Sequence, residues 1–509
     1  MDLGKLDIAA MRKSIIEEEG TRYPSKTYAE YANRPGYDAS KKEFPILVSI
    51  QKAHFVMLVK QRLLGREDTA AIKKALSSIP YDEFYSSEYD SLNEDMYYTM
   101  ESWMMKNFGE GTGNLHLGRS RNDIGSATMR IRLRNSLLTV MDALQELHTA
   151  FVALAKEHRD LVMVAHTHSQ QAQIGTFGHI LIGFAKVLER CIENCKNAYI
   201  NVNMSPMGAA AIEGSGFNID RDMVSGLLGF DGLVENTYDA ISCSDHIAQA
   251  ACAIKITAIE TGRITASLLQ WNTQEFNLIR CAPCFVGTSS IMPQKRNPGP
   301  LEYIRRNCTR VIGECDAALL AEDNIPYEEY ITLEESVNSA ISGMERLIKA
   351  GHLLSLVIST MGVEKQSFEK WARETFAGIT EFSDMLVREE GINYRYAHHV
   401  AHEIAGYCVD HHITLDRMPF DIVEASFEKV IGRKLSAPRD KVMKSLDSAN
   451  FVRVRTVKGG PAPEPMQAML ESSVNVHNKH DQWINAAKSA LEESEKKLDA
   501  AFNLVSFQE

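Results

Sequence analysis

The sequence lacks apolar stretches long enough to cross a bilayer, because its 509 residues contain no run of about 18 apolar residues. Residues 1–19 mix charges of both signs with scattered apolar side chains. They therefore also lack the continuous apolar centre of a secretory signal. From these two absences we expect a cytoplasmic protein that does not bind membranes.

Basic residues are in the minority, with 55 Lys and Arg against 67 Asp and Glu and a formal net charge of -12. A nucleic-acid partner would require a basic surface to neutralise phosphates, so this charge balance argues against one. An anionic substrate would instead need a locally basic pocket on an acidic surface.

Cysteine is also scarce. The nine cysteines are an odd number without even spacing, which favours reduced thiols over a disulfide framework. Cys281 and Cys284 form a lone Cys-x-x-Cys that would need two further ligands to hold zinc. We expect no metal site.

Proline is nearly absent from the middle of the chain. The segments 124–158 and 207–281 contain none, and long amphipathic helices are predicted over 124–158, 235–279, 299–322 and 327–361. Helices of this length cannot bury their apolar faces within one compact monomer. The sequence therefore predicts a helix bundle that partner subunits complete.

Shorter amphipathic patterns flank this region. Helices are predicted over 46–64, 68–79 and 92–108, and a second group of short helices over 369–459, followed by a terminal amphipathic helix. We expect an all-α chain of three domains: an N-terminal helical domain (1–118), a central long-helix bundle (119–368) and a small C-terminal helical domain (369–509).

Segment 287–298 has the composition of a loop and reads Gly-Thr-Ser-Ser-Ile-Met-Pro-Gln-Lys-Arg-Asn-Pro. Gly287 permits unusual backbone angles, and Pro293 and Pro298 interrupt any helix. Ile291 and Met292 are its only large apolar residues, so we expect them to fasten the loop to the body. Two hydroxyls, a lysine and an asparagine favour a binding site, although an ordinary polar loop has a similar composition.

Two further polar clusters stand out. Segment 115–123 reads Leu-His-Leu-Gly-Arg-Ser-Arg-Asn-Asp and precedes a predicted helix, where it could serve as a charged cap or as an anion site. Segment 166–173 reads His-Thr-His-Ser-Gln-Gln-Ala-Gln and is predicted to open a helix that continues toward Ala198. Metal binding by His166 and His168 is disfavoured, because two ligands on the same face of a helix must be three or four residues apart.

These strings resemble known motifs. Segment 287–298 resembles the signature of the fumarase/aspartase superfamily, Gly-Ser-Ser-x-Met-Pro-x-Lys-x-Asn-Pro, with Thr288 where the glycine is expected and Gly287 one position earlier. Segment 115–123 is similar to the hallmark of the argininosuccinate lyase branch. Segment 167–174 is similar to that branch's Thr-His-Leu-Gln-x-Ala-Gln-Pro, with Ile174 replacing the proline. The resemblance implies an all-α homotetramer whose active sites draw on three chains, with no cofactor.

The implied reaction is β-elimination: a proton leaves the carbon beside a carboxylate, nitrogen is expelled from the next carbon, and fumarate forms. By this resemblance Ser289 is the base, and Lys295 and Asn297 stabilise the aci-carboxylate dianion. His168 acts as general acid or orients a carboxylate, and Glu302 holds its imidazole. The resemblance also implies that the other carboxylate is fixed by Ser120, Arg121, Asn122 and Thr167, and further substrate contacts are expected from Ser290 and Met292.

Without the resemblance, the same residues have plainer interpretations. A lone histidine such as His168 is more often a satisfied core residue than a catalyst. Glu302 alone would be interpreted as an exposed helix carboxylate. The resemblance also leaves a non-catalytic structural member of the fold as an alternative, as some lens crystallins are.

Three strings expected around the arginine end of argininosuccinate are altered. Segment 20–23 stands where a Trp-Gly-Gly-Arg-Phe-like string is expected, segment 93–101 lacks the expected histidine and asparagine, and segment 329–335 lacks a lysine. We therefore expect a lyase for an N-substituted aspartate, comparable to the ethylenediamine-disuccinate lyase type. Glu328 and Glu329 hint at a cationic amine, though solvated helix charges are an equal interpretation. Argininosuccinate lyase proper is the alternative.

Overall fold

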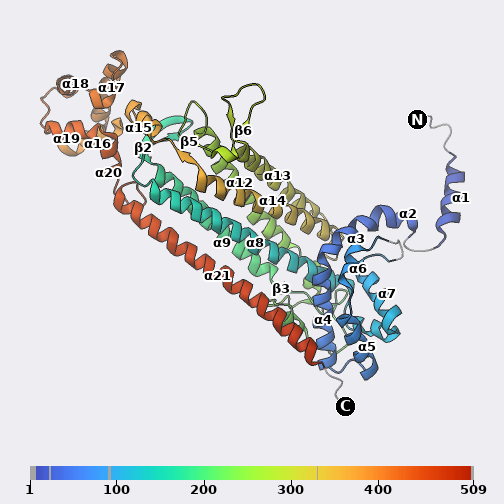
Figure 1. The fold of residues 1–509 in the computed structure, drawn as a ribbon. Helices are drawn as coiled ribbons and strands as arrows, with labels where there is room; N and C mark the ends of the chain where they lie inside the picture. The colour runs from blue at the N-terminus through green and yellow to red at the C-terminus, as the bar shows by residue number, and fades with distance from the viewer. Residues whose placement is uncertain (1–6, 22–24, 90–92, 330, 506–509) are drawn as a thin grey trace.

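Long helices lie side by side along the molecule and carry a group of shorter helices at each end (Figure 1). The computed structural model describes residues 7–21, 25–89, 93–329 and 331–505. The bundle consists of α8 (Arg121–Glu157), α9 (Phe177–Val202), α12 (Asp245–Trp271), α13 (Gly299–Ala321), α14 (Thr332–Thr360) and α21 (Pro463–Leu504). The predicted all-α architecture with a long central bundle is confirmed.

Helix α8 is the centre of this bundle and packs against α9, α14 and α21. By length and composition alone it could span a membrane, but 67% of its most apolar window is buried inside the molecule. Its apolar side chains share one core with those of α9, α12, α13 and α14. The helix therefore has the properties of a core helix.

The N-terminal helices after α1 gather at the end of the bundle where α8 begins, and α1 extends away from them (Figure 1). They have a core of their own, which includes Phe44, Phe55 and Met100 and which Leu498 and Phe502 from α21 enter. Their bounds are α1 (Ile8–Glu19), α2 (Lys26–Tyr28), α3 (Arg34–Ser40), α4 (Phe44–Lys60), α5 (Arg66–Ser77), α6 (Tyr81–Ser86) and α7 (Met96–Phe108).

The opposite end carries the second group of short helices, with a separate core around Phe382, Ile404 and Phe427. Their bounds are α15 (Lys365–Glu374), α16 (Ile379–Glu390), α17 (Tyr394–Asp410), α18 (Phe420–Ile431), α19 (Arg439–Ser445) and α20 (Ser448–Arg453). The predicted domain boundaries at 118 and 368 stay predictions, while α21 itself contributes Met466, Leu470 and Ile484 to the core of the bundle.

The helix predicted from segment 166–173 toward Ala198 is wrong in its first part. Strands β1 (Val162–Thr167) and β2 (Gln170–Thr176) form an antiparallel hairpin, and α9 begins only at Phe177, capped by Thr176. His168 and Ser169 adopt positive φ values of 51° and 59°. Two such residues in succession make the tight turn that a hairpin needs, and this turn prevents a helix.

The single helix predicted over 235–279 is also wrong. It is interrupted after α11 (Thr237–Ser242), where Cys243 is extended (ψ 139°), and it resumes as α12, which ends at Trp271. Small two-stranded pairings occupy the connections: β3 (Met204–Ser205) with β4 (Gly232–Leu233), and β5 (Ile279–Arg280) with β8 (Gly362–Val363). Another short helix, α10 (Arg221–Leu227), precedes β4. All nine cysteines are free thiols, as predicted.

Helix α21 docks on the bundle through a seam of histidines, of which His148 and His480 are buried and His477 is half-buried. The rings of His148 on α8 and His477 on α21 stack with centroids 5.3 Å apart, and His148 Nε2 lies 3.3 Å from Glu189 Oε1. His480 Nε2 lies 3.3 Å from Glu193 Oε2. Burial lowers the pKa of His477 and of His480 below the ordinary histidine value, so docked α21 favours neutral rings.

This seam predicts that α21 loosens in mild acid. Once released, His477 and His480 bind protons below about pH 6.5, whereas their docked rings resist protonation. The free-energy cost of keeping α21 docked therefore grows as pH falls from about 6.5 toward the lowered docked-state pKa. Trp483 reports on docking because its ring packs edge-on against Tyr199, 5.3 Å away. Tryptophan fluorescence titrated with pH should show a transition below pH 6.5. This fluorescence transition should be absent from a Trp483→Phe control.

The matched variant is His477→Phe combined with His480→Gln, which keeps a stacking ring and an N–H donor but removes both titrations. We expect its acid transition to be weaker or shifted to lower pH. A transition of unchanged midpoint and size would contradict the assignment to this seam.

Candidate active site

Three predicted site residues lie at the N-terminus of α8. Ser120 is its N-cap: Ser120 Oγ accepts a hydrogen bond from Asn122 N at 3.3 Å, and Asp123 Oδ1 accepts one from Ser120 N at 2.9 Å. This is a capping box, which fixes the angle at which the helix begins. The side chain of Asn122 donates to the carbonyl of Ala211 at 3.0 Å.

Asp123 is buried and fastens the cap to a distant loop. Its Oδ2 accepts hydrogen bonds from the N–H groups of Gly208 and Ala210 at 3.0 and 3.2 Å. Burial raises the pKa of Asp123 to about 6, against the effect of these donors. The motif around Asp123 did not predict this role, although an acidic residue three positions after Ser120 is the sequence signal of a capping box.

Arg121 already has protein partners. Its Nη2 lies 3.1 Å from Glu94 Oε2, and its Nη1 donates to Asp95 Oδ2 at 2.8 Å. Although burial opposes its charge, these carboxylates raise the pKa of Arg121 above its ordinary value. Both partners belong to the altered string 93–101, which sequence analysis did not connect with Arg121.

The altered string 329–335 reaches the same end of the bundle. Burial raises the pKa of Glu329, and the positive charge of Arg121 acts against that rise. Burial likewise raises the pKa of Glu334, whose charged neighbours include Asp95 and Arg132. Two of the three altered strings therefore place carboxylates around one arginine cluster. Arg22, Tyr23 and Tyr330 from these strings lie outside the described residues.

The other predicted residues lie at the opposite end of the bundle. Thr167 and His168 are exposed at the turn between β1 and β2. Glu302 is exposed in the first turn of α13. Within the described parts of this single chain, no hydrogen bond or ion pair joins His168 to Glu302.

The signature segment is a hairpin flap. Strands β6 (Gly287–Thr288) and β7 (Arg296–Asn297) pair antiparallel and project residues 289–295 from the bundle (Figure 1). Ser289 Oγ accepts hydrogen bonds from the N–H groups of Ile291 and Met292, at 3.4 and 3.0 Å. Ser290 and Lys295 are exposed at this tip, and Asn297 is half-buried at its base.

The expectation that Ile291 and Met292 fasten the flap to the body is wrong for this chain. Ile291 is 81% exposed and Met292 is 40% exposed. The β6–β7 backbone pairing holds the flap instead, so its apolar tip remains available to another surface.

One chain does not bring the two groups of site residues together. Helix α13 begins directly after the flap and ends just before the segment that carries Glu329. Its 23 residues correspond to about 35 Å at 1.5 Å per residue. Ser289 and Arg121 of the same chain therefore lie too far apart to contact one small substrate.

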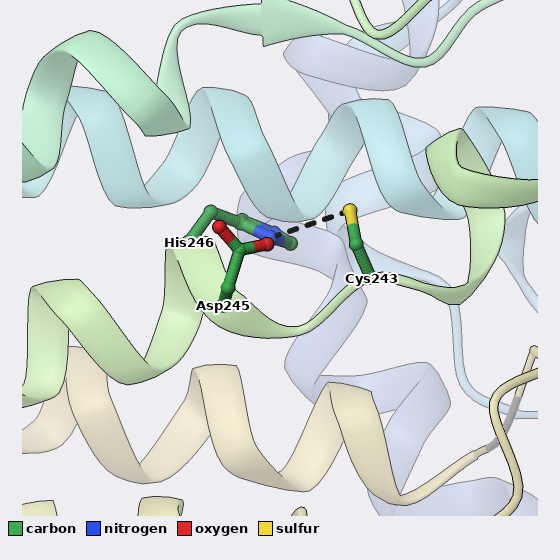
Figure 2. A group of neighbouring side chains, drawn as sticks. All are labelled: Cys243, Asp245 and His246. Carbon is green, nitrogen blue, oxygen red and sulfur yellow. Dashed lines mark hydrogen bonds between the residues drawn. The ribbon is translucent and has the colours of Figure 1, made fainter. Parts of the chain in front are cut away.

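A separate group has the residue types of a metal site: Cys243, Asp245 and His246 (Figure 2). However, Arg130 Nη2 donates to Cys243 Sγ at 3.1 Å and lies 3.3 Å from His246 Nδ1. Burial raises the pKa of the Cys243 thiol, whereas metal binding requires the thiolate. A fixed guanidinium facing these ligands repels a cation, so the group does not fit a metal.

Comparison with known proteins places this arrangement in a family. Residues 54–313 match the family model described as Lyase, and residues 376–453 match the one described as Argininosuccinate lyase C-terminal. The argininosuccinate lyase of Methanocaldococcus jannaschii is 31% identical over 444 residues, covering 87% of this chain and 90% of the relative. That of Methanothrix thermoacetophila is 32% identical over 455 residues, covering 89% and 90%.

The chain belongs to the argininosuccinate lyase branch of the fumarase/aspartase superfamily. This lyase also resembles solved structures of EDDS lyase, one a variant with bound fumarate and one a complex with formate. Each is 29% identical, with a TM-score of 0.84, over 96% of this chain and 97% of that chain. The family and these neighbours identify a fumarate-releasing carbon–nitrogen lyase.

Proposed function

We propose that this lyase cleaves an N-substituted aspartate whose leaving group is a cationic amine other than arginine. The observation that supports this proposal is a difference between the strings expected around fumarate and those expected around the leaving group. The strings assigned to fumarate largely match the family, whereas two altered strings come together near Arg121. Glu94 and Asp95, which pair with Arg121, stand where the family string also has Glu and Asp. The added carboxylates are therefore Glu329 and Glu334, and burial raises the pKa of each. Carboxylates in a partly desolvated site favour a positively charged ligand.

In the proposed mechanism Ser289 removes the proton from the carbon beside a substrate carboxylate. The N–H groups of Ile291 and Met292 point at Ser289 Oγ, where they would stabilise a developing negative charge. Lys295 and Asn297 stabilise the aci-carboxylate dianion, and Arg121 of another chain binds the second carboxylate of the substrate. His168, oriented by Glu302, serves the acid step. Nitrogen leaves with its bonding electron pair and a proton, and fumarate remains.

We also propose a cytoplasmic homotetramer whose active sites combine chains and take a small dicarboxylate rather than nucleic acid or membrane. The roughly 35 Å between the flap and the Arg121 cluster supports shared sites. Exposed apolar side chains on the bundle support subunit contacts: Ile256 and Ile259 on α12, Leu320 on α13 and Leu356 on α14. The exposed tip of the flap would then reach a neighbouring subunit.

Cleavage of argininosuccinate itself is the second candidate. The names of the relatives from Methanocaldococcus jannaschii and Methanothrix thermoacetophila favour it. The guanidinium of argininosuccinate is also cationic, so the carboxylates around Arg121 suit both candidates, and it is the change in strings 93–101 and 329–335 that favours the first.

Ser289→Ala should lower the elimination rate by at least a hundredfold, as expected from the loss of a general base. The change removes one hydroxyl from an exposed hairpin, so the melting temperature and circular dichroism should stay unchanged. Thr288→Ala, one residue away on β6, is the matched control and should lose little activity. More than about a tenth of the parental rate in Ser289→Ala would exclude Ser289 as the sole base.

Mixing two inactive variants should restore activity if sites are shared between chains. We choose Ser289→Ala and Arg121→Ala, because their positions lie at opposite ends of one chain. After subunit exchange, some sites would combine an intact Ser289 with an intact Arg121 from different chains. Activity would be measured against unmixed variants, with exchange verified by mass spectrometry of tagged subunits. Full exchange without recovered activity would contradict shared sites.

The substrate preference can be measured directly. We expect kcat/KM for N-(aminoalkyl)aspartates to exceed that for argininosuccinate by about a hundredfold or more, because a site built for one polar group discriminates against ligands that leave its groups unpaired. Fumarate formation would be followed by its ultraviolet absorbance across a panel of cationic and neutral amines. If argininosuccinate is the best substrate of the panel, the second candidate is correct.

A further inference from the structure

The Arg121 guanidinium is held on two edges and one face by a single turn of chain. Glu94 and Asp95 form ion pairs of 3.1 and 2.8 Å with its two terminal nitrogens. The ring of Tyr98 lies against it, with 4.6 Å between the guanidinium carbon and the ring centroid. These partners lie at and just before the start of α7, so one local structure contacts Arg121 from three directions.

Asp95 couples this turn to the arginine. Its Oδ1 accepts the N–H of Tyr98 at 2.9 Å, which caps α7, while its Oδ2 accepts from Arg121 Nη1 at 2.8 Å. The cap fixes the backbone at Tyr98 and thereby the position of the ring. Tyr97 packs edge-on against Tyr98 with centroids 5.6 Å apart, which further restricts that ring.

A guanidinium has five N–H donors in one plane, so two ion pairs leave others for a ligand. A ring stacked on its face sets the orientation of that plane and also attracts the cation through the ring's quadrupole. Arg121 is 36% exposed at its side chain, so its unused donors remain accessible. A carboxylate arriving there would meet donors that are already aligned, which is the effect of preorganisation.

We propose that Tyr98 is a positioning residue that fixes the plane of Arg121 for a substrate carboxylate. This inference rests on the proposed function, in which Arg121 binds that carboxylate. Tyr98 does not touch the substrate in this account. It acts through Arg121, together with the ion pairs from Glu94 and Asp95, and its aromatic face rather than its hydroxyl carries the effect.

The test uses fumarate as the probe and measures its dissociation constant by calorimetry in the full-length Ser289→Ala protein, which binds without turnover. Tyr98→Phe keeps the ring face and should bind within about twofold of the parent. Tyr98→Leu should weaken binding about tenfold, the size expected for a partly desolvated cation–π contact. Arg121→Ala should weaken binding about a hundredfold or more, because it removes a charge-assisted carboxylate ligand.

A second variant separates ring electronics from packing and covers the case in which Tyr98→Leu fails to fold. Pentafluorophenylalanine at position 98 keeps the ring shape but reverses the quadrupole, so it should weaken fumarate binding relative to Tyr98→Phe at an unchanged melting temperature. A purely structural Tyr98 would instead lower the melting temperature in Tyr98→Leu and leave fumarate affinity unchanged in the fluorinated protein.

The outcomes distinguish this inference from the proposed function. Loss of binding in Arg121→Ala, with parental affinity in both ring-altered proteins, would overturn the role of Tyr98 and leave that of Arg121 intact. Parental affinity in Arg121→Ala would overturn Arg121 as a carboxylate ligand, and the proposed role of Tyr98 with it.

Discussion

The length of the bundle helices is the constraint on which this structure's function depends. A helix is rigid over its length, so α13 separates the flap from the Arg121 cluster by about 35 Å in every copy of the chain. Catalysis as proposed needs a base, a carboxylate-binding arginine and an acid within a few ångströms. In the proposed tetramer, the same rigidity that keeps these groups apart in one chain would let them meet between copies, because each group sits at a defined end of the bundle.

The charges at the two ends of the bundle in one chain differ. The flap carries Lys295 and backbone N–H groups, which favour negative charge on fumarate. The Arg121 end combines that cation with several carboxylates, three of which have raised pKa values: Glu43, Glu329 and Glu334. A cationic amine entering this region would relieve the repulsion between them. This gives a physical reason for the altered strings to change together.

Sequence reasoning succeeded where a local rule determines the structure. The absence of proline predicted α8, and amphipathic patterns predicted α13 and α14. The polar string 118–123 indicated a helix start close to the observed start of α8, although the helix was predicted from 124. Sequence reasoning failed where backbone pairing overrides composition. The hairpin at 162–176 depends on positive φ at His168 and Ser169 and on strand contacts, which no helical periodicity reveals. The break at Cys243 similarly depends on its burial beside Arg130.

The candidate site divides in the same way. The motif resemblance alone predicted Ser289, Lys295 and the cap of α8 as parts of the site, because each lies within one short string of the sequence. The clamp on Arg121 joins residues 26 positions apart, and the carboxylate from 329 arrives from another helix connection, so only the fold reveals their meeting. Apart from the position of Tyr98 just after a helix cap, the sequence did not indicate that its ring contacts Arg121.

The most direct test of shared catalysis is a structure of the assembled Ser289→Ala protein with fumarate bound. We predict that one fumarate contacts residue 289 on the flap of one copy and Arg121 of another copy, with His168 close by. A fumarate whose contacts all come from one copy, or one bound without Arg121, would contradict the account.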